Sequence, residues 1–366
     1  MTLSPNDAES IRTLECYQQA RRDGYEPLMV VDGDTRLNRE DGRGCRLLGS
    51  GNLCNVHREA GFSAKPTTCQ LYPFTLVNTP DGYFVSTAFT CPAVIAGVGV
   101  NASQHADTIR DTLRRDSLFS PSRVVHKDTV RLSARTSIEW PLYLEFEEHL
   151  LRRASLEPCL SSALIKGVLE LVTYERNLYR DLPAGRESEA TSLLFRELAR
   201  RLATIVSDIS ALFEERAEPE KREQLPQKIL EERFYSNLVG GEISGYRPYR
   251  EFDHLLRDIL YRYIDNEIRG KLLLAPPNLV TRLLTLAIKI ELFSLYYAGK
   301  CEVSGVRHFD FSLVEWTFEL LEADMMEHDE LYLPFVEELQ RFAFRIAEVS
   351  NPSPPRRNKG NSEEEH

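Results

Sequence analysis

The chain has 366 residues, with 45 basic and 56 acidic side chains and a formal net charge of −11. An acidic chain of this kind is a poor candidate for non-specific nucleic-acid binding. The length exceeds that of a usual single domain, so we expect two structural units.

The N-terminal segment lacks the pattern of an export signal, and the most hydrophobic stretch lacks that of a membrane span. Met1–Gly24 has no apolar run that could form the core of a signal peptide. The most hydrophobic stretch, Leu272–Ala298, is interrupted by two prolines and by charged side chains, so we predict that it does not span a membrane. We therefore expect a cytoplasmic protein, in which disulfides seldom persist.

The first hundred residues are rich in glycine and turn residues. Pro5–Gln19 is predicted to be one helix, with Ser4 as its N-cap, Pro5 at the first helical position and Asp7 at the spacing of a capping box. Asp32–Asp34 is predicted to be a turn between two short extended segments.

A β-hairpin is predicted next. Leu71–Asn78 and Tyr83–Phe89 alternate as strands do, and Thr79–Gly82 between them has proline and glycine where a turn needs them. This pairing places Cys69 and Cys91 almost opposite each other at the open end of the hairpin, on strands about 5 Å apart.

Beyond residue 100 the apolar residues recur at helical spacing. Leu198, Leu202, Ile205 and Ile209 are predicted to share one buried helix face. Further helices are expected around Ser137–Ala154, Leu160–Leu182, Pro248–Arg269, Asn278–Tyr297, Phe311–Glu322 and Leu331–Val349. The predicted fold class is α+β, mostly α. An irregular cysteine-rich domain with a β-hairpin occupies residues 1–100, a helical domain residues 101–350, and a disordered tail residues 351–366.

Four cysteines and a histidine gather in the first of these domains, at Cys45, Cys54, His57, Cys69 and Cys91. Four thiolates satisfy either a tetrahedral zinc ion or a 4Fe–4S cluster. Disulfides are the alternative, but the expected compartment and the odd total of seven cysteines favour a metal. Four separate packing cysteines would not explain why these thiols fall among turns and at a hairpin end.

Other residues near the cluster have open roles. His57 could be a fifth ligand, replace one thiolate, hold a ligand by a hydrogen bond, or be a surface histidine. Lys65 could place positive charge near the thiolates or be solvated. Cys16, Cys159 and Cys301 stand in helical contexts and are expected to be packing residues.

The sequence predicts no catalytic residue and no residue that binds an organic cofactor. Gly97-Val98-Gly99 follows an apolar run, but the third glycine and the strand–helix–strand context of a dinucleotide site are missing. Phosphate loops, nucleophile elbows and zinc-protease motifs are absent from the sequence as well.

Three segments resemble a known family. Gly51–His57, Lys65–Phe74 and Phe89–Pro92 are similar to the zinc- and iron-chelating cysteine-cluster proteins of the YkgJ type, which include the flagellin lysine-N-methylases. The resemblance covers roughly residues 40–95. It is fairly specific, because the residue types around each cysteine agree as well as the spacing. It implies a metal-binding domain with ligands at Cys45, Cys54, Cys69 and Cys91, followed by a long helical region.

The same resemblance implies a protein-lysine N-methyltransferase with a protein substrate and S-adenosylmethionine as methyl donor. An iron–sulfur cluster is preferred over zinc. The alternative is a non-catalytic, zinc-stabilised module that binds a protein partner. Family members also carry a Cys-x2-Cys-x2-Cys-Cys run near the N-terminus, which this chain lacks. Thr2–Ala8 resembles the segment just after that run, so we expect the upstream genomic reading frame to encode the missing cysteines.

Overall fold

The structure is a computed structural model that divides into two compact units, Met1–His126 (unit 1) and Lys127–His366 (unit 2). It describes residues 3–31, 33–38, 44–49, 51, 53–115, 123–124, 129–178, 188–214, 225–247, 253–325 and 329–349. The expected tail over residues 351–366 lies outside the described residues. The predicted fold class, α+β and mostly α, is confirmed.

Unit 1 begins with two helices where the sequence predicted one. α1 (Pro5–Arg12) and α2 (Glu15–Arg22) are separated at Thr13 and Leu14. The predicted cap is present, because Ser4 Oγ accepts a hydrogen bond from the Asp7 amide at 3.1 Å. The break follows from a distant contact, since the Glu59 carboxylate accepts hydrogen bonds from the first two amides of α2, each at 2.8 Å. This cap gives α2 its own N-terminus.

Two strands flank the predicted turn, of which Asp32 lies outside the described residues. β1 (Leu28–Val31) and β2 (Asp34–Leu37) are antiparallel, with Val31 opposite Asp34. Gly33 has a φ of 87°, a left-handed conformation that glycine adopts without strain.

The predicted hairpin is confirmed, with strands shorter at one end than expected. β3 (Phe74–Thr79) and β4 (Gly82–Thr87) are antiparallel, and β5 (Arg123–Val124) pairs with β3 in parallel. Leu71, predicted to start a strand, instead ends a short helix. The short helices of unit 1 are α3 (Asn55–Ala60), η3 (Phe62–Ala64), α4 (Thr67–Leu71), α5 (Pro92–Ala96), η4 (Ala102–His105) and α6 (Ala106–Arg115).

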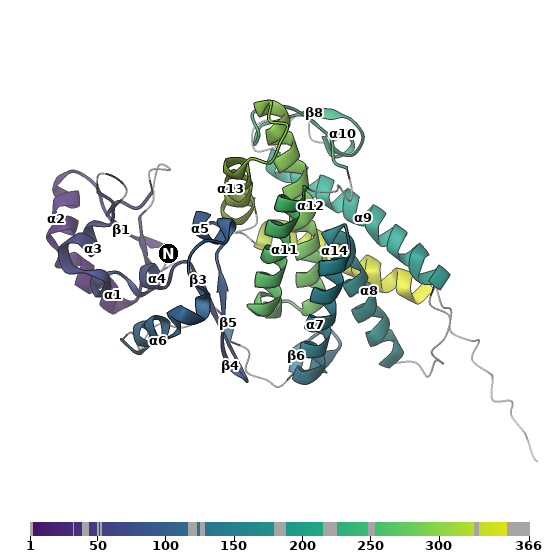
Figure 1. Cartoon of the computed structure of the whole chain (residues 1–366), viewed down its shortest axis with the longest axis horizontal. Helices are drawn as coiled ribbons and strands as arrows, with labels where there is room; N and C mark the ends of the chain where they lie inside the picture. The colour runs from purple at the N-terminus through teal and green to yellow at the C-terminus, as the bar shows by residue number, and fades with distance from the viewer. Residues whose placement is uncertain are drawn as a thin grey trace, which may run out of the picture. The chain divides into compact units, whose positions relative to one another are not determined.

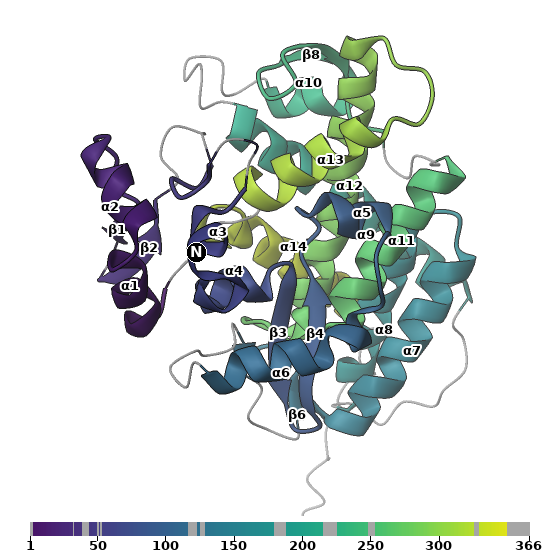
Figure 2. The ribbon, with the colours of Figure 1, turned by 60° about the vertical axis from the view of Figure 1, so that its left-hand side comes forward.

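Unit 1 extends past residue 100, the end that the sequence predicts for the first domain. Ile109 of α6 shares a small core with Leu71 and Leu76, and Leu113 packs against it. Figure 2 shows α6 lying against the β3–β4 hairpin. Because α6 buries its apolar side in this core, it belongs to unit 1.

Unit 2 is a helical bundle with two added hairpins that the sequence analysis did not predict. Its helices are α7 (Trp140–Leu156), α8 (Leu160–Leu178), α9 (Ser188–Glu214), α10 (Leu225–Glu231), α11 (His254–Arg269), η7 (Leu272–Leu274), α12 (Leu279–Ser304), α13 (Phe311–Glu319), the π-helical η8 (Leu320–Met325) and α14 (Asp329–Val349). The hairpins are β6 (Thr129–Arg131) with β7 (Ser137–Glu139), and β8 (Arg233–Ser236) with β9 (Gly241–Ser244).

The long helix α12 is the centre of this bundle (Figure 1). It contacts α8, α9, α13 and α14, and it is buried on nearly every side from Leu279 to Tyr296. The predicted face of α9 is confirmed, since Leu198, Leu202, Ile205 and Ile209 are each 0% exposed. Within the described residues, every helix is either too short or too polar to cross a lipid bilayer.

Candidate metal-binding cysteine site

The loop from Cys45 to Cys54 closes on itself through backbone hydrogen bonds. The Leu48 amide donates to the Cys45 carbonyl at 3.0 Å, and Leu48 forms an isolated antiparallel bridge with Cys54. Cys54 then caps the N-terminus of α3. The two ends of this loop therefore lie close together, and both thiols pack against the same small core of unit 1.

Cys69 reaches the same region from α4. That helix is anchored by Asp7 of α1, whose carboxylate accepts a hydrogen bond from the Thr67 amide at 2.8 Å. Burial raises the pKa of the Cys69 thiol to about 11, negative charge at Cys45 and Cys54 adds to the rise, and Lys65 opposes it. The pKa of the Cys69 thiol is therefore sensitive to both of the other thiols, Cys45 and Cys54.

Cys16 joins this group, although the sequence analysis expected it to be a packing residue. Cys16, Cys45, Cys54 and Cys69 all pack against one small core of eight buried residues. The pKa of the Cys16 thiol is raised to about 12. Burial is the largest cause, the Glu59 carboxylate beside it is the next, and Cys54 contributes more weakly. The local sequence does not indicate that Cys16 reaches this core, because its position depends on the break between α1 and α2.

Cys91 and His57 stand apart from that core. Cys91 caps the N-terminus of α5, beyond the open end of the hairpin, and it is not among the described residues that pack against the eight-residue core. His57 is exposed on α3, where its ring centroid lies 6.1 Å from that of Phe62. The hairpin register is as predicted, but Cys69 lies in α4 before the strands, and Cys91 stands at the N-cap position of α5 after them.

The thiols suit a soft metal chemically, but their present spacing does not form a chelate. All seven cysteines fall in the described part of the chain, and each is a free thiol. No group of three His, Cys, Asp or Glu side chains among the described residues lies close enough to hold a metal ion. A shared metal would therefore require Cys45, Cys54 and Cys69 to approach one another further.

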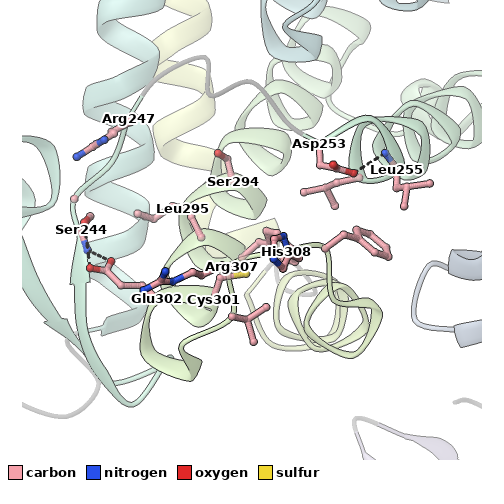
Figure 3. Close-up of a pocket in the computed structure, with 17 residues that line it drawn as sticks. Ser244, Arg247, Asp253, Leu255, Ser294, Leu295, Cys301, Glu302, Arg307 and His308 are labelled. Atoms are coloured by element: carbon pink, nitrogen blue, oxygen red, sulfur yellow. Dashed lines mark hydrogen bonds between the residues drawn. The ribbon is translucent and has the colours of Figure 1, made fainter.

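The two remaining cysteines belong to unit 2. Cys159 lies 3.2 Å from the hydroxyl of Ser161, measured from sulfur to oxygen. Cys301 of α12 lines a cavity of about 720 Å³, together with Asp253 and His308 (Figure 3). The helical context of Cys301 predicts a packing residue, and a side chain in a cavity wall has the same sequence context.

Hydrogen bonds hold the wall of this cavity in place. Glu302 accepts from the Ser244 amide at 2.8 Å, and Asp253 caps α11 by accepting from the Leu255 amide at 2.9 Å, as the dashed lines in Figure 3 show. Burial raises the pKa of Tyr297 to about 12, so this hydroxyl beside Cys301 stays protonated at neutral pH.

Comparisons of the chain with family models, with curated proteins and with solved structures found no match.

Proposed function

We propose that unit 1 is a thiol-based metal-binding module, in which Cys45, Cys54 and Cys69 supply ligands to an iron–sulfur cluster or a zinc ion. The observation that carries the proposal is the gathering of these three thiols around one small core. Thiolates are the preferred protein ligands of both groups.

The size of that core supports the proposal independently. Among the described residues, eight buried side chains form this core, and three form a second cluster in unit 1. Small cores of this kind supply little hydrophobic stabilisation, and small domains often obtain the rest from a structural metal or disulfides. The binding energy of a metal would act as folding energy here, because it would draw the free thiols together.

The test is metal analysis of protein purified without oxygen, measuring iron, acid-labile sulfide and zinc per chain. We expect a stoichiometric metal in the wild type and its loss in Cys45→Ser, Cys54→Ser and Cys69→Ser. Cys159→Ser and Cys301→Ser in unit 2 are the matched controls and should keep it. A wild type without bound metal, or three thiol variants that retain it, contradicts the proposal.

The fourth ligand is decided by two further variants in the same assay. Cys16→Ser tests the thiol that shares the small core, and Cys91→Ser tests the thiol named by the family resemblance. The variant with the larger loss of metal identifies the ligand.

The proposal that the protein transfers methyl groups to a protein lysine rests only on the resemblance to the cysteine-cluster family. Incubation with S-adenosylmethionine labelled in its methyl group and with flagellin separates this activity from a non-catalytic role in binding a protein partner. Label that enters flagellin and depends on the metal ligands supports the enzyme. A metal-loaded protein that transfers no label supports the zinc-stabilised interaction module.

A further inference from the structure

A second cavity in unit 2, of about 690 Å³, is rich in basic side chains. It lies where the β6–β7 hairpin, the C-terminal half of α8, the start of α12 and α14 meet. Five arginines line it against two glutamates, and they are Arg131, Arg135, Arg176, Arg341 and Arg345. This local sign is opposite to the chain's net charge of −11.

Most of these guanidinium groups have no counter-ion among the residues that the structure describes. Within the described part of the chain, Arg131, Arg135, Arg341 and Arg345 make no ion pair or side-chain hydrogen bond. Arg176 is held in place by a hydrogen bond to the carbonyl of Ala347. Positive charges gathered around a concave surface raise the local concentration of anions, and the planar guanidinium matches the geometry of phosphate oxygens.

Glu175 gives the cavity a second, different polar feature. Its side chain lines the cavity and the residue is 6% exposed, yet Oε2 has no hydrogen-bond partner among the described residues. Buried carboxylate oxygens are nearly always hydrogen-bonded, and one left without a donor is costly. A ligand that carries a hydroxyl or amino group would supply the missing donor.

The rest of the lining is apolar and sets the size of the ligand. Val172, Pro277 and Phe344 contribute apolar surface, and a volume in this range suits a small organic molecule rather than a lone ion. We propose that this cavity binds a small phosphate ester of nucleotide size. Its phosphate lies among the arginines, Arg341 and Arg345 included, and a hydroxyl or amino group donates to Glu175.

The experiment is isothermal titration calorimetry of the full chain at low ionic strength, with adenosine monophosphate, pyrophosphate and citrate as probes. We expect saturable binding of adenosine monophosphate that weakens with added salt. Arg341→Ala and Arg345→Ala should each weaken it about tenfold. Arg307→Ala, an exposed arginine on the other cavity, is the matched control and should bind as the wild type does.

Glu175→Met tests recognition of the ligand's hydroxyl or amino group separately from recognition of its phosphate. It removes the carboxylate while keeping the length of the side chain, and it should weaken adenosine monophosphate binding while leaving pyrophosphate binding unchanged. Thermal unfolding of every variant verifies that the fold is intact. The proposal is overturned if the wild type binds no adenosine monophosphate, if the Arg341 and Arg345 variants bind it as tightly as the control, or if citrate binds equally well.

Discussion

The buried ion pair between Glu147 of α7 and Lys271 provides a sharp test of how unit 2 is held together. Lys271 Nζ donates to Glu147 Oε2, and Tyr143 Oη donates to Glu147 Oε1 at 2.8 Å. The two charged side chains are 4% and 6% exposed. Lys271→Met leaves the Glu147 carboxylate in the interior without its counter-charge. Removing one partner of a buried pair costs about 3–5 kcal/mol, and we expect the free energy of unfolding to fall by that amount near neutral pH.

The size of this loss should depend on pH. Burial raises the pKa of Glu147, and the bonds from Lys271 and Tyr143 counteract part of the rise. A carboxyl whose pKa is raised in the folded state takes up a proton on folding, so it favours the folded state increasingly as pH falls toward its unfolded pKa of about 4.3. Without Lys271 the folded pKa rises further. The deficit of the variant should therefore shrink as the solution is acidified from neutral pH.

Urea denaturation followed by tryptophan fluorescence measures this directly. Both tryptophans of the chain, Trp140 and Trp316, belong to unit 2. Trp140 lies 5.6 Å from Lys271 Nζ, measured to the ring centroid, so transition midpoints rather than intensities should be compared. The control is Arg269→Met, which removes two exposed ion pairs, with Glu148 and with Asp265, each worth at most about 1 kcal/mol. A deficit no larger than that of the control, or one independent of pH, would refute the reasoning.

Three further variants test other parts of the fold. Leu202→Ala opens a cavity at a side chain that is 0% exposed in α9, and should lower the free energy of unfolding of unit 2 by about 2–5 kcal/mol in the same urea assay. Gly245→Ala places a methyl group against the backbone oxygens of Ile229 and Glu232, and should cost about 1–3 kcal/mol by the same measurement. Ser4→Ala removes the cap of α1 and should cost about 1 kcal/mol, seen as faster amide hydrogen exchange in that helix; unchanged exchange would mean that the cap contributes nothing.

The elements that the sequence predicted correctly are those defined by neighbouring residues. The hairpin of β3 and β4 follows from alternation on either side of a turn that contains Pro80 and Gly82. The buried face of α9 follows from apolar residues at helical spacing, from Leu198 to Ile209. In both cases the local pattern and the tertiary packing require the same conformation, so the pattern is sufficient.

The elements that the sequence did not predict depend on distant partners. The break between α1 and α2 is stabilised by Glu59, which caps α2 from another helix. The assignment of α6 to unit 1 depends on its contact with Leu71 and Leu76. Neither partner can be chosen from the local sequence, because several exposed carboxylates and apolar stretches would serve equally well.

The candidate site divides in the same way. Cys45 and Cys54 are brought together by a short loop that the glycine-rich sequence favours. Cys16 reaches the same core only through the position of α2, and Cys91 is carried away from it by α5. The spacing of the cysteines in the sequence therefore indicates a thiol-rich site. Which thiols share one core depends on the tertiary fold.

The burial of α12 on nearly every side has a consequence for the order in which unit 2 is completed during synthesis. A helix that is buried on nearly every side cannot rest on a single neighbour, and here the helices that cover it come from both earlier and later parts of the chain. Until α13 and α14 have emerged from the ribosome, the side of α12 that they cover stays exposed to water. A chain that stops before α14 would present this surface to other chains, so aggregation rather than partial folding is the expected fate of C-terminal truncations.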